Sequence, residues 1–186
     1  MNPLSHEVWN RGLSYADYRR SVTRNGEVFD EVYEDPAYRR GELALLGSLP
    51  PLRVLAMGED WCPDVYHTLP TWARIAEELP DWDLKVFPRD THPDLMRHFL
   101  WIKDAQRIPV YAFYDDAGRL QTWWSGRSAT AQKALDDALA GRAYADLEPE
   151  ERKRVGQALE DGYRRELRRK NFEEILVQLR AFFHLP

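Results

Sequence analysis

The stretch Glu59-Asp60-Trp61-Cys62-Pro63-Asp64-Val65 decides how the chain is interpreted. The apolar run at 52–57 precedes it and is typical of a buried strand. A helical pattern follows it, and Pro63 suits the first turn of that helix, where its missing N–H costs nothing. The helix is indicated by apolar residues that recur at steps of four and three, namely Val65, Leu69, Trp72, Ala76 and Leu79. Cys62 is therefore predicted to lie at a strand–turn–helix junction.

This position has chemical consequences for Cys62. The amides at the start of a helix and its dipole favour a thiolate over a thiol, which lowers the pKa of a cysteine placed there. The acidic neighbours Glu59, Asp60 and Asp64 oppose that effect, so we expect only a mild lowering of the Cys62 pKa. An isolated cysteine is more often a small buried apolar residue. The strand–turn–helix placement favours a reactive thiol over that alternative.

Composition excludes several classes of function. The chain has 186 residues and a single cysteine, which rules out an internal disulfide and a metal site built from several cysteines. A formal net charge of -5 argues against nonspecific binding to nucleic acid or to anionic membranes. The five histidines lack ligand spacing, so we expect no metal site. With neither a secretory signal nor a membrane-spanning run evident, we expect a cytoplasmic protein.

The middle of the chain alternates between strand and helix patterns. Further strands are predicted at 84–87, 109–114 and 120–124, with a helix from 91 or 92 to 102 and another over 128–140. The order β-α-β-α-β-β-α over 51–141 predicts an α/β fold with a mixed four-stranded sheet and helices on both faces. Trp123 and Trp124 are expected to point to opposite faces of that sheet.

Helical patterns flank this domain on both sides. We assign 1–50 as an N-terminal helical extension, 51–141 as the central domain and 142–186 as a C-terminal helical extension. Asn171 is predicted to cap a second helix within the C-terminal extension. The basic cluster at 164–170 is expected to be a solvated helix face balanced by acids, with an anionic partner as the alternative.

The motif and its setting resemble the thioredoxin superfamily. The segment around Trp61 and Cys62 is similar to the family's W-C-x-x-C site, and Arg107-Ile108-Pro109-Val110 resembles the segment that carries its cis-proline. Gly126, just before the last helix, is another match. The resemblance covers about 51–141 and implies a thioredoxin-like fold. The helical flanks resemble a bacterial subgroup in which the second motif cysteine is often missing.

Two departures bear on activity. Val65 occupies the position of the second, resolving cysteine, and Ala56 stands where thioredoxins carry a buried acid. The resemblance implies Cys62 as the catalytic residue. The surrounding groove would be formed by Trp61, Pro63, Asp64, Ile108 and Pro109.

Two functions are compatible with these residues. The first is a monothiol thiol–disulfide oxidoreductase in which an external thiol resolves the adduct on Cys62. It requires no bound cofactor, with a low-molecular-weight thiol as the co-substrate, and its partner is a protein or a small disulfide or thiol. The second is a redox-inactive, thioredoxin-like protein-binding module. Neither function involves nucleic acid or a membrane. The helical extensions are also compatible with formation of a homodimer.

Overall fold

A four-stranded mixed sheet forms the centre of the computed structural model, which describes residues 4–100 and 105–185. The strand order is β2-β1-β3-β4, in which β1 pairs parallel to β2 and antiparallel to β3, and β3 pairs antiparallel to β4. This is the predicted topology, with a parallel β-α-β unit followed by an antiparallel hairpin. The strands are β1 (Leu52–Gly58), β2 (Trp82–Pro88), β3 (Val110–Tyr114) and β4 (Leu120–Ser125).

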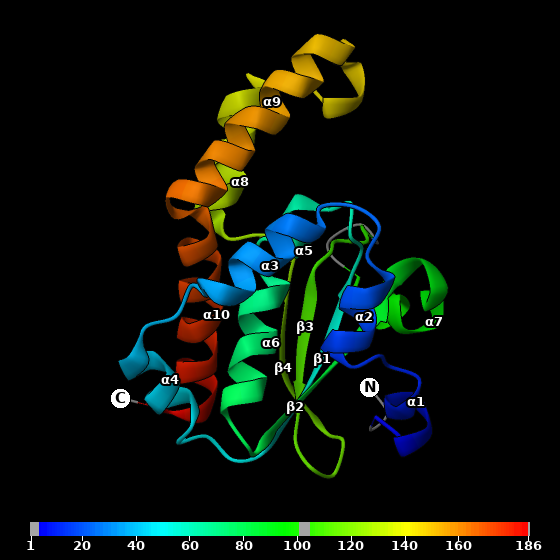
Figure 1. Ribbon diagram of the computed structural model, residues 1–186, viewed down its shortest axis with the longest axis vertical. Coiled ribbons are helices and arrows are strands. Elements are labelled where there is room, and N and C mark those ends of the chain that lie inside the picture. The colour runs from blue at the N-terminus through cyan, green and yellow to red at the C-terminus, as the bar shows by residue number, and fades with distance from the viewer. Residues whose placement is uncertain (1–3, 101–104, 186) are drawn as a thin grey trace.

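Helices surround the sheet and extend beyond it (Figure 1). Those before and around the motif are α1 (His6–Asn10), α2 (Tyr15–Ser21), α3 (Gly26–Glu34), α4 (Arg40–Leu46), α5 (Pro63–Tyr66), α6 (Leu69–Glu78) and α7 (Pro93–Met96). Those after the sheet are α8 (Ala129–Leu139), α9 (Pro149–Gly162) and α10 (Arg168–Phe183). Short 3-10 turns lie at Arg89–Thr91, Arg97–Phe99 and Tyr144–Asp146, and a π-helical turn, Tyr163–Leu167, joins α9 to α10.

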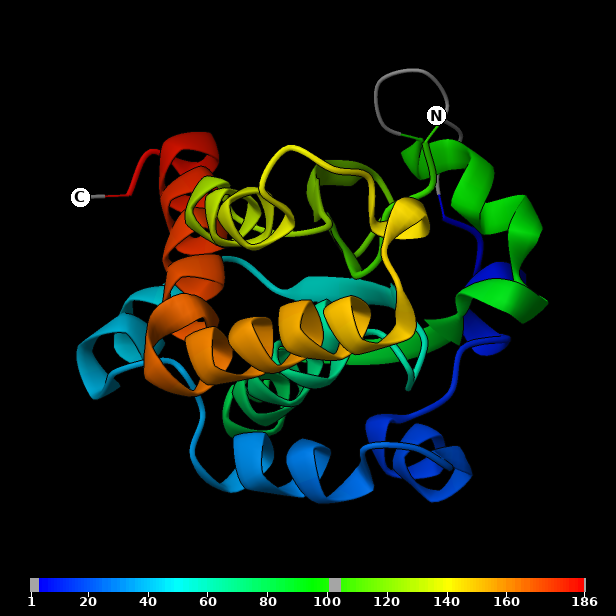
Figure 2. The same cartoon turned by 90° about the horizontal axis from the view of Figure 1, so that it is seen from above.

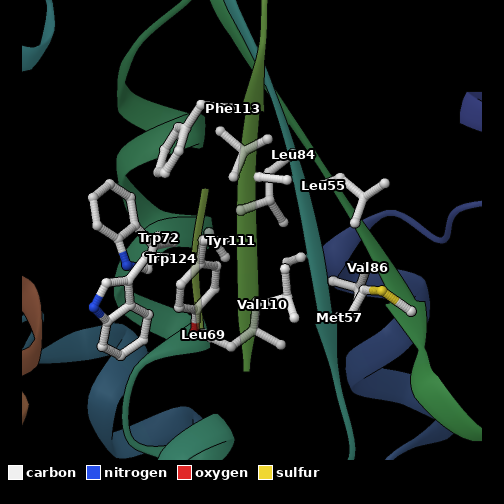
Figure 3. Close-up of a cluster of buried hydrophobic side chains, with 14 of the residues drawn as sticks. Leu55, Met57, Leu69, Trp72, Leu84, Val86, Val110, Tyr111, Phe113 and Trp124 are labelled. Carbon is white, nitrogen blue, oxygen red and sulfur yellow. The ribbon is translucent and has the colours of Figure 1, made fainter. Parts of the chain in front are cut away.

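Both faces of the sheet are covered, because the central strands β1 and β3 are almost continuously apolar and successive side chains point to opposite faces. On one face, Trp72 of α6 packs against Phe113 of β3 and Phe172 of α10, with ring centroids 5.6 and 5.5 Å away (Figure 3). On the other face, Phe99 packs against Trp123 at 5.5 Å. Trp124 instead stacks on Tyr111 of the first face, so the two adjacent tryptophans point to opposite faces as predicted.

Both extensions are built into this core. Leu13 exchanges backbone hydrogen bonds with Val86 of β2, which adds a bridge at the edge of the sheet. In the C-terminal extension, Glu174 accepts a hydrogen bond from the Trp124 indole at 2.9 Å. A single buried apolar cluster therefore includes side chains from all three segments of the chain.

Helices α8 and α9 form an arm that rises past the end of the sheet where Cys62 lies (Figures 1 and 2). Within this arm, α8 buries only Ala131 fully, against Tyr163 and Leu167 of the π-helical turn. Helix α10 returns alongside the sheet and contacts β4. The arm is thus anchored at one end, next to the motif.

The structure corrects two details of the sequence analysis. The helix after the motif is broken into α5 and α6, because Pro70 lacks the N–H that a continuous helix would need and its ring would clash with the preceding turn. Asn171 does not cap a helix. It lies inside α10, fully buried, and its side-chain oxygen accepts a hydrogen bond from the Ser128 N–H at 2.8 Å.

A further predicted helix, over 91–102, is shorter in the structure. Helix α7 and the 3-10 turn after it end at Phe99, and part of the predicted range lies outside the described residues. Among residues 4–100 and 105–185, no helix is long and apolar enough to cross a membrane.

Candidate functional site

Cys62 lies at the end of the turn after β1 and is the N-cap residue of α5. Its side chain is only 7% exposed, and Sγ donates a long hydrogen bond to the Ile108 carbonyl oxygen at 3.8 Å. The backbone N–H groups of Asp64 and Val65 are directed to the sulfur and favour its charged form. The strand–turn–helix placement predicted from the sequence is confirmed.

The expected lowering of the Cys62 pKa is wrong. Burial of the sulfur, with a further contribution from the Asp64 carboxylate, raises the pKa of Cys62 to about 12. The amides of Val65 and Asp64 and the Arg127 guanidinium oppose this but do not prevail. Helix α5 is a single turn long, so its dipole is a weak counterweight to burial.

The segment facing the thiol carries the expected proline. The Ile108–Pro109 peptide bond is cis, as the resemblance implies, and both residues are buried. The Pro109 carbonyl oxygen accepts a hydrogen bond from the Gly126 N–H at 2.8 Å, which ties this segment to the start of α8. Gly126 has a φ of 79°, in the left-handed region that favours glycine. A Cβ there would meet the Arg107 side chain at 3.3 Å, so the glycine lets Arg107 lie across this junction.

Asp64 is held by protein groups. It is 2% exposed, its Oδ2 is 2.6 Å from an Nη of Arg127, and its Oδ1 accepts a hydrogen bond from the Tyr163 hydroxyl. Burial raises the pKa of Asp64, while Arg127 and Tyr163 hold it down. These two contacts fix the Asp64 carboxylate beside the thiol.

Sequence reasoning missed Tyr163 and Arg127. Tyr163 has helical spacing with Val155, Leu159 and Leu167, which is typical of a core position, and its partner Asp64 lies 99 residues earlier in the chain. Only the fold brings the two together, so no local pattern pointed to this contact. Arg127 directly follows Gly126, the glycine before α8, and this position was the only sequence feature that could have placed it near the motif.

Trp61 is the exposed member of the motif. Its side chain is 43% exposed, and the Arg89 guanidinium lies 5.1 Å from the centre of its ring, within cation–π range. Pro63 is half-buried in the first turn of α5. The motif thus presents one large aromatic face to solvent beside the buried sulfur.

A cleft of about 280 Å³ lies over Cys62, and we call it the thiol cleft. Four of the six predicted site residues line it, whereas Pro63 and Pro109 are not among the described lining residues. Helix α8 supplies one wall. The lining residues are Trp61, Cys62, Asp64, Arg89, Gln106, Arg107, Ile108, Gly126, Arg127, Gln132 and Leu135.

The two departures from the thioredoxin pattern are both buried. Val65 is fully buried against Gly58, where an added Cβ would come within 2.7 Å of a Val65 methyl group. Ala56 is 1% exposed and pairs across the sheet with Tyr111. The Tyr111 hydroxyl is hydrogen-bonded to the Thr68 hydroxyl at 2.6 Å. Both positions are thus filled by packed apolar side chains, where thioredoxins have a thiol and a carboxylate.

The nearby histidine belongs to a separate polar cluster. His67 Nε2 is 2.9 Å from Glu160, and its Nδ1 accepts a hydrogen bond from Arg168 at 3.1 Å. Burial lowers the pKa of His67 to about 4, so the ring is neutral near pH 7. Because Glu160 and Arg168 engage both ring nitrogens, His67 is not placed to act as a base for the Cys62 thiol.

The basic cluster at 164–170 is balanced by acids, as predicted, but it is not a solvated face, because Arg168 and Arg169 are largely buried. Arg164 and Arg168 both pair with Glu31 of α3, at 2.8 and 2.7 Å, and Arg169 pairs with Glu42 of α4. These contacts fasten the C-terminal extension to the N-terminal one. Within the part of the chain that the structure describes, no group of three or more His, Cys, Asp or Glu side chains is placed to hold a metal ion.

Comparison with known proteins agrees with this geometry. The family model described as Thioredoxin matches residues 12–139, more than half of the chain. The chain is a member of the thioredoxin family. No curated protein matches this thioredoxin-family sequence.

Two solved structures share its fold. One is an HIV epitope scaffold, with 18% identity, a TM-score of 0.56, and coverage of 82% of this chain and 93% of the scaffold. The other is a protein of unknown function from Pseudomonas aeruginosa, with 18% identity, a TM-score of 0.55, and coverage of 86% of this chain and 96% of that one. At this identity the similarity concerns the fold alone, and it extends beyond the span of the family model.

Proposed function

We propose that this thioredoxin-family protein is a monothiol thiol–disulfide oxidoreductase that acts through Cys62 and an external resolving thiol. The observation that carries the proposal is the placement of the Cys62 sulfur at the base of the thiol cleft. There it lies against the Ile108 carbonyl, next to the cis peptide bond. A disulfide entering the cleft would meet both the sulfur and the Ile108 backbone.

The reaction consists of two balanced exchanges. The Cys62 thiol loses its proton to solvent, and the thiolate attacks one sulfur of a disulfide. A Cys62–substrate disulfide forms, and the other half leaves as a thiolate. An external thiolate then attacks the substrate sulfur of that adduct, which forms a new disulfide and releases the Cys62 thiolate. Val65 occupies the position of an internal resolving thiol, so the second step depends on another molecule.

The raised Cys62 pKa shapes this cycle. It reduces the thiolate fraction, although the intrinsic nucleophilicity of a thiolate rises with its pKa and offsets part of the loss. It also makes Cys62 a poor leaving group in the second exchange, because thiols of lower pKa leave faster. The adduct on Cys62 should therefore be long-lived once formed.

Mass spectrometry of the intact protein tests the proposal. The folded protein is incubated with oxidised glutathione, and reduced glutathione is then added. We expect one mixed disulfide on Cys62, its slow removal by the thiol, and no adduct on Cys62→Ser. Absence of any adduct on the folded protein, with ready modification of Cys62 in urea, would show that the sulfur is inaccessible to this chemistry.

A second candidate function is a redox-inactive binding module. It is favoured by the raised pKa of Cys62 together with Ala56 at the position of the buried acid. In that case the cleft and the exposed Trp61 would hold a partner without exchange, and Cys62 would stay unmodified in the same incubation.

A further inference from the structure

A second cavity lies beside the same turn as the thiol cleft but shares no lining residue with it. It has a volume of about 250 Å³, and we call it the acid pocket. Its walls come from α2, the loop after α2, the turn after β1 and the end of β2. The exchange proposed at Cys62 makes no use of it. The described lining residues are Tyr18, Ser21, Val22, Thr23, Glu59, Asp60 and Pro88.

The hydroxyl of Tyr18 is buried at this pocket without a hydrogen-bond partner. Tyr18 is 3% exposed, and among the described residues nothing bonds its hydroxyl. Burial raises the pKa of Tyr18, and the carboxylates of Glu59 and Asp60 raise it further, so the hydroxyl lies close to the two acids of the pocket. Buried polar groups without a partner are uncommon in native proteins, because they are unfavourable. A ligand that bonds the Tyr18 hydroxyl would remove that cost.

Each of the two acids has one oxygen held by the protein. Glu59 Oε1 accepts a hydrogen bond from the Asp90 N–H at 2.8 Å. Asp60 Oδ2 accepts from the N–H groups of Thr23 and Arg24, at 2.8 and 3.0 Å, and from the Thr23 hydroxyl at 3.1 Å. Within the described part of the chain, no donor is bonded to Glu59 Oε2 or to Asp60 Oδ1. One carboxylate oxygen of each acid therefore remains for a ligand.

The negative charge of the acid pocket is not balanced by a cation of the protein. Across residues 4–100 and 105–185, neither Glu59 nor Asp60 forms an ion pair. Burial raises the pKa of Glu59, and Arg89 lowers it only in part, because Arg89 pairs with Asp90 at 2.6 Å. The hydrogen bonds that the two acids accept come from neutral groups. The pocket thus attracts a positively charged ligand.

The acceptors favour one kind of cation. A divalent metal ion is less suitable, because the described residues bring no third carboxylate, histidine or cysteine to this place. A guanidinium matches both oxygens of a single carboxylate, and here one oxygen of each is already held. A primary ammonium has three N–H donors that diverge from one nitrogen. It matches two oxygens from separate carboxylates together with the Tyr18 hydroxyl, which can accept.

We infer that the acid pocket binds a primary ammonium group on a short aliphatic chain, with Glu59, Asp60 and Tyr18 as its acceptors. Val22 and Pro88 supply apolar atoms against which the chain can pack. A small amine and a lysine side chain of a protein share this chemistry. The binding is separate from the proposed function and does not depend on it.

Nuclear magnetic resonance of the isotope-labelled full chain tests the inference near neutral pH. The N–H groups of Thr23, Arg24 and Asp90 donate to the two acids, so n-butylammonium should shift their signals in a saturable way. Ionic strength is held constant with sodium chloride. Tetramethylammonium, a cation without N–H donors, should bind at least about tenfold more weakly, the factor that one hydrogen bond to a charged group contributes.

Three further ligands define the chemistry and its source. n-Butanol has the same chain without the charge and should not bind. n-Butylguanidinium should bind more weakly than n-butylammonium. A capped tripeptide with a central lysine distinguishes the two sources: binding tighter than that of n-butylammonium indicates a lysine of a protein, and binding no tighter indicates a small amine.

Substitutions assign the binding to named residues. Glu59→Gln should reduce the affinity for n-butylammonium by about fivefold, the factor that one unit-charge contact at 4 Å contributes in water. Tyr18→Phe should reduce it by about tenfold. Its midpoint of urea unfolding should not fall, because the lost hydroxyl has no partner in the described structure. Glu34→Gln is the matched control, because Glu34 is an exposed acid at the end of α3.

The outcomes are decisive in both directions. Absence of a saturable shift up to about 100 mM n-butylammonium, which excludes a Kd in the millimolar range, would overturn the inference. So would equal binding of tetramethylammonium, or an affinity that is unchanged in both Glu59→Gln and Tyr18→Phe. Affinity that is reduced in these two variants and retained in Glu34→Gln would support the inference.

Discussion

Replacing Asp64 by asparagine should make Cys62 more reactive. The pKa of Cys62 is raised from 9.0 to about 12, which is a penalty of about 4 kcal/mol on the thiolate at about 1.36 kcal/mol per unit. At pH 7 the thiolate is then about one molecule in 100,000, about a thousandfold less than for an unperturbed thiol. Burial is the larger cause, and the Asp64 carboxylate is the second.

Asp64→Asn removes the second cause and leaves the first. Asparagine keeps the shape of the side chain and still accepts a hydrogen bond from Tyr163, while Arg127 loses its counter-charge and favours the thiolate more strongly. Because a nearby like charge shifts a pKa by about one unit or more, we expect a fall of about one unit and a tenfold faster alkylation at pH 7.

The assay is the rate of iodoacetamide alkylation, followed by mass spectrometry from pH 6 to 11. For the wild type, the rate should climb about tenfold per pH unit without a plateau, since the thiol titrates above this range. Asp116→Asn, an exposed carboxylate in the β3–β4 turn, is the control for a simple loss of charge. A wild-type plateau below pH 9, or an unchanged profile for Asp64→Asn, would refute this account of the thiol.

Three other perturbations follow from the same geometry. Tyr163→Phe removes the hydroxyl that donates to buried Asp64 and should lower the free energy of unfolding, measured in urea, by about 1–3 kcal/mol. Tyr144→Phe is the control, because Tyr144 is exposed. An unchanged urea midpoint for Tyr163→Phe would contradict a structural role for this hydrogen bond. Val65→Cys supplies the missing second thiol and should allow an internal disulfide, so that free-thiol titration after mild oxidation finds fewer thiols than in its reduced form; unchanged titration would mean that the two sulfurs do not meet. The pKa of His67 is about 4 in the folded state and 6.5 in the unfolded state, so between these values only the unfolded state binds the proton. As the pH falls from 6.5 to 4, the free energy of unfolding should therefore decrease by about 3 kcal/mol. The slope of unfolding free energy with pH over that window should be shallower in His67→Gln, and an equal slope would argue against His67 as its source.

The sequence was most informative where signals are local. Strand and helix periodicity, the β3–β4 turn and the motif at 59–65 predicted the order of elements and the position of Cys62, since each depends on neighbours a few residues apart. The break between α5 and α6 was visible in principle at Pro70, but the apolar spacing across it suggested one helix.

The electrostatics of the site could not be predicted in the same way. A helix start implied a lowered Cys62 pKa, but the direction depends on how much protein covers the sulfur, and that follows from tertiary packing. Asp64 similarly appeared to be a free acid beside the thiol. Its partners Arg127 and Tyr163 come from the α8 junction and the C-terminal extension, 63 and 99 residues away from it. The three arginines that line the thiol cleft are likewise dispersed in the sequence, so no local pattern predicted that they would lie together.

The continuous helical segment from α9 through the π-helical turn into α10 also bears on where this domain can be cut. Tyr163 in that segment bonds Asp64, Asn171 accepts from the Ser128 N–H, and Glu174 accepts from both the Ala129 N–H and the Trp124 indole. A fragment ending at 139, where the family model stops, would lack Tyr163, Asn171 and Glu174. The buried Asp64 carboxylate, the Ser128 and Ala129 N–H groups and the Trp124 indole would then lose these hydrogen-bond partners. We therefore expect that a fragment ending where the family model stops does not fold stably on its own. Limited proteolysis between α8 and α9 should leave the two pieces associated, and their separation should unfold the larger one.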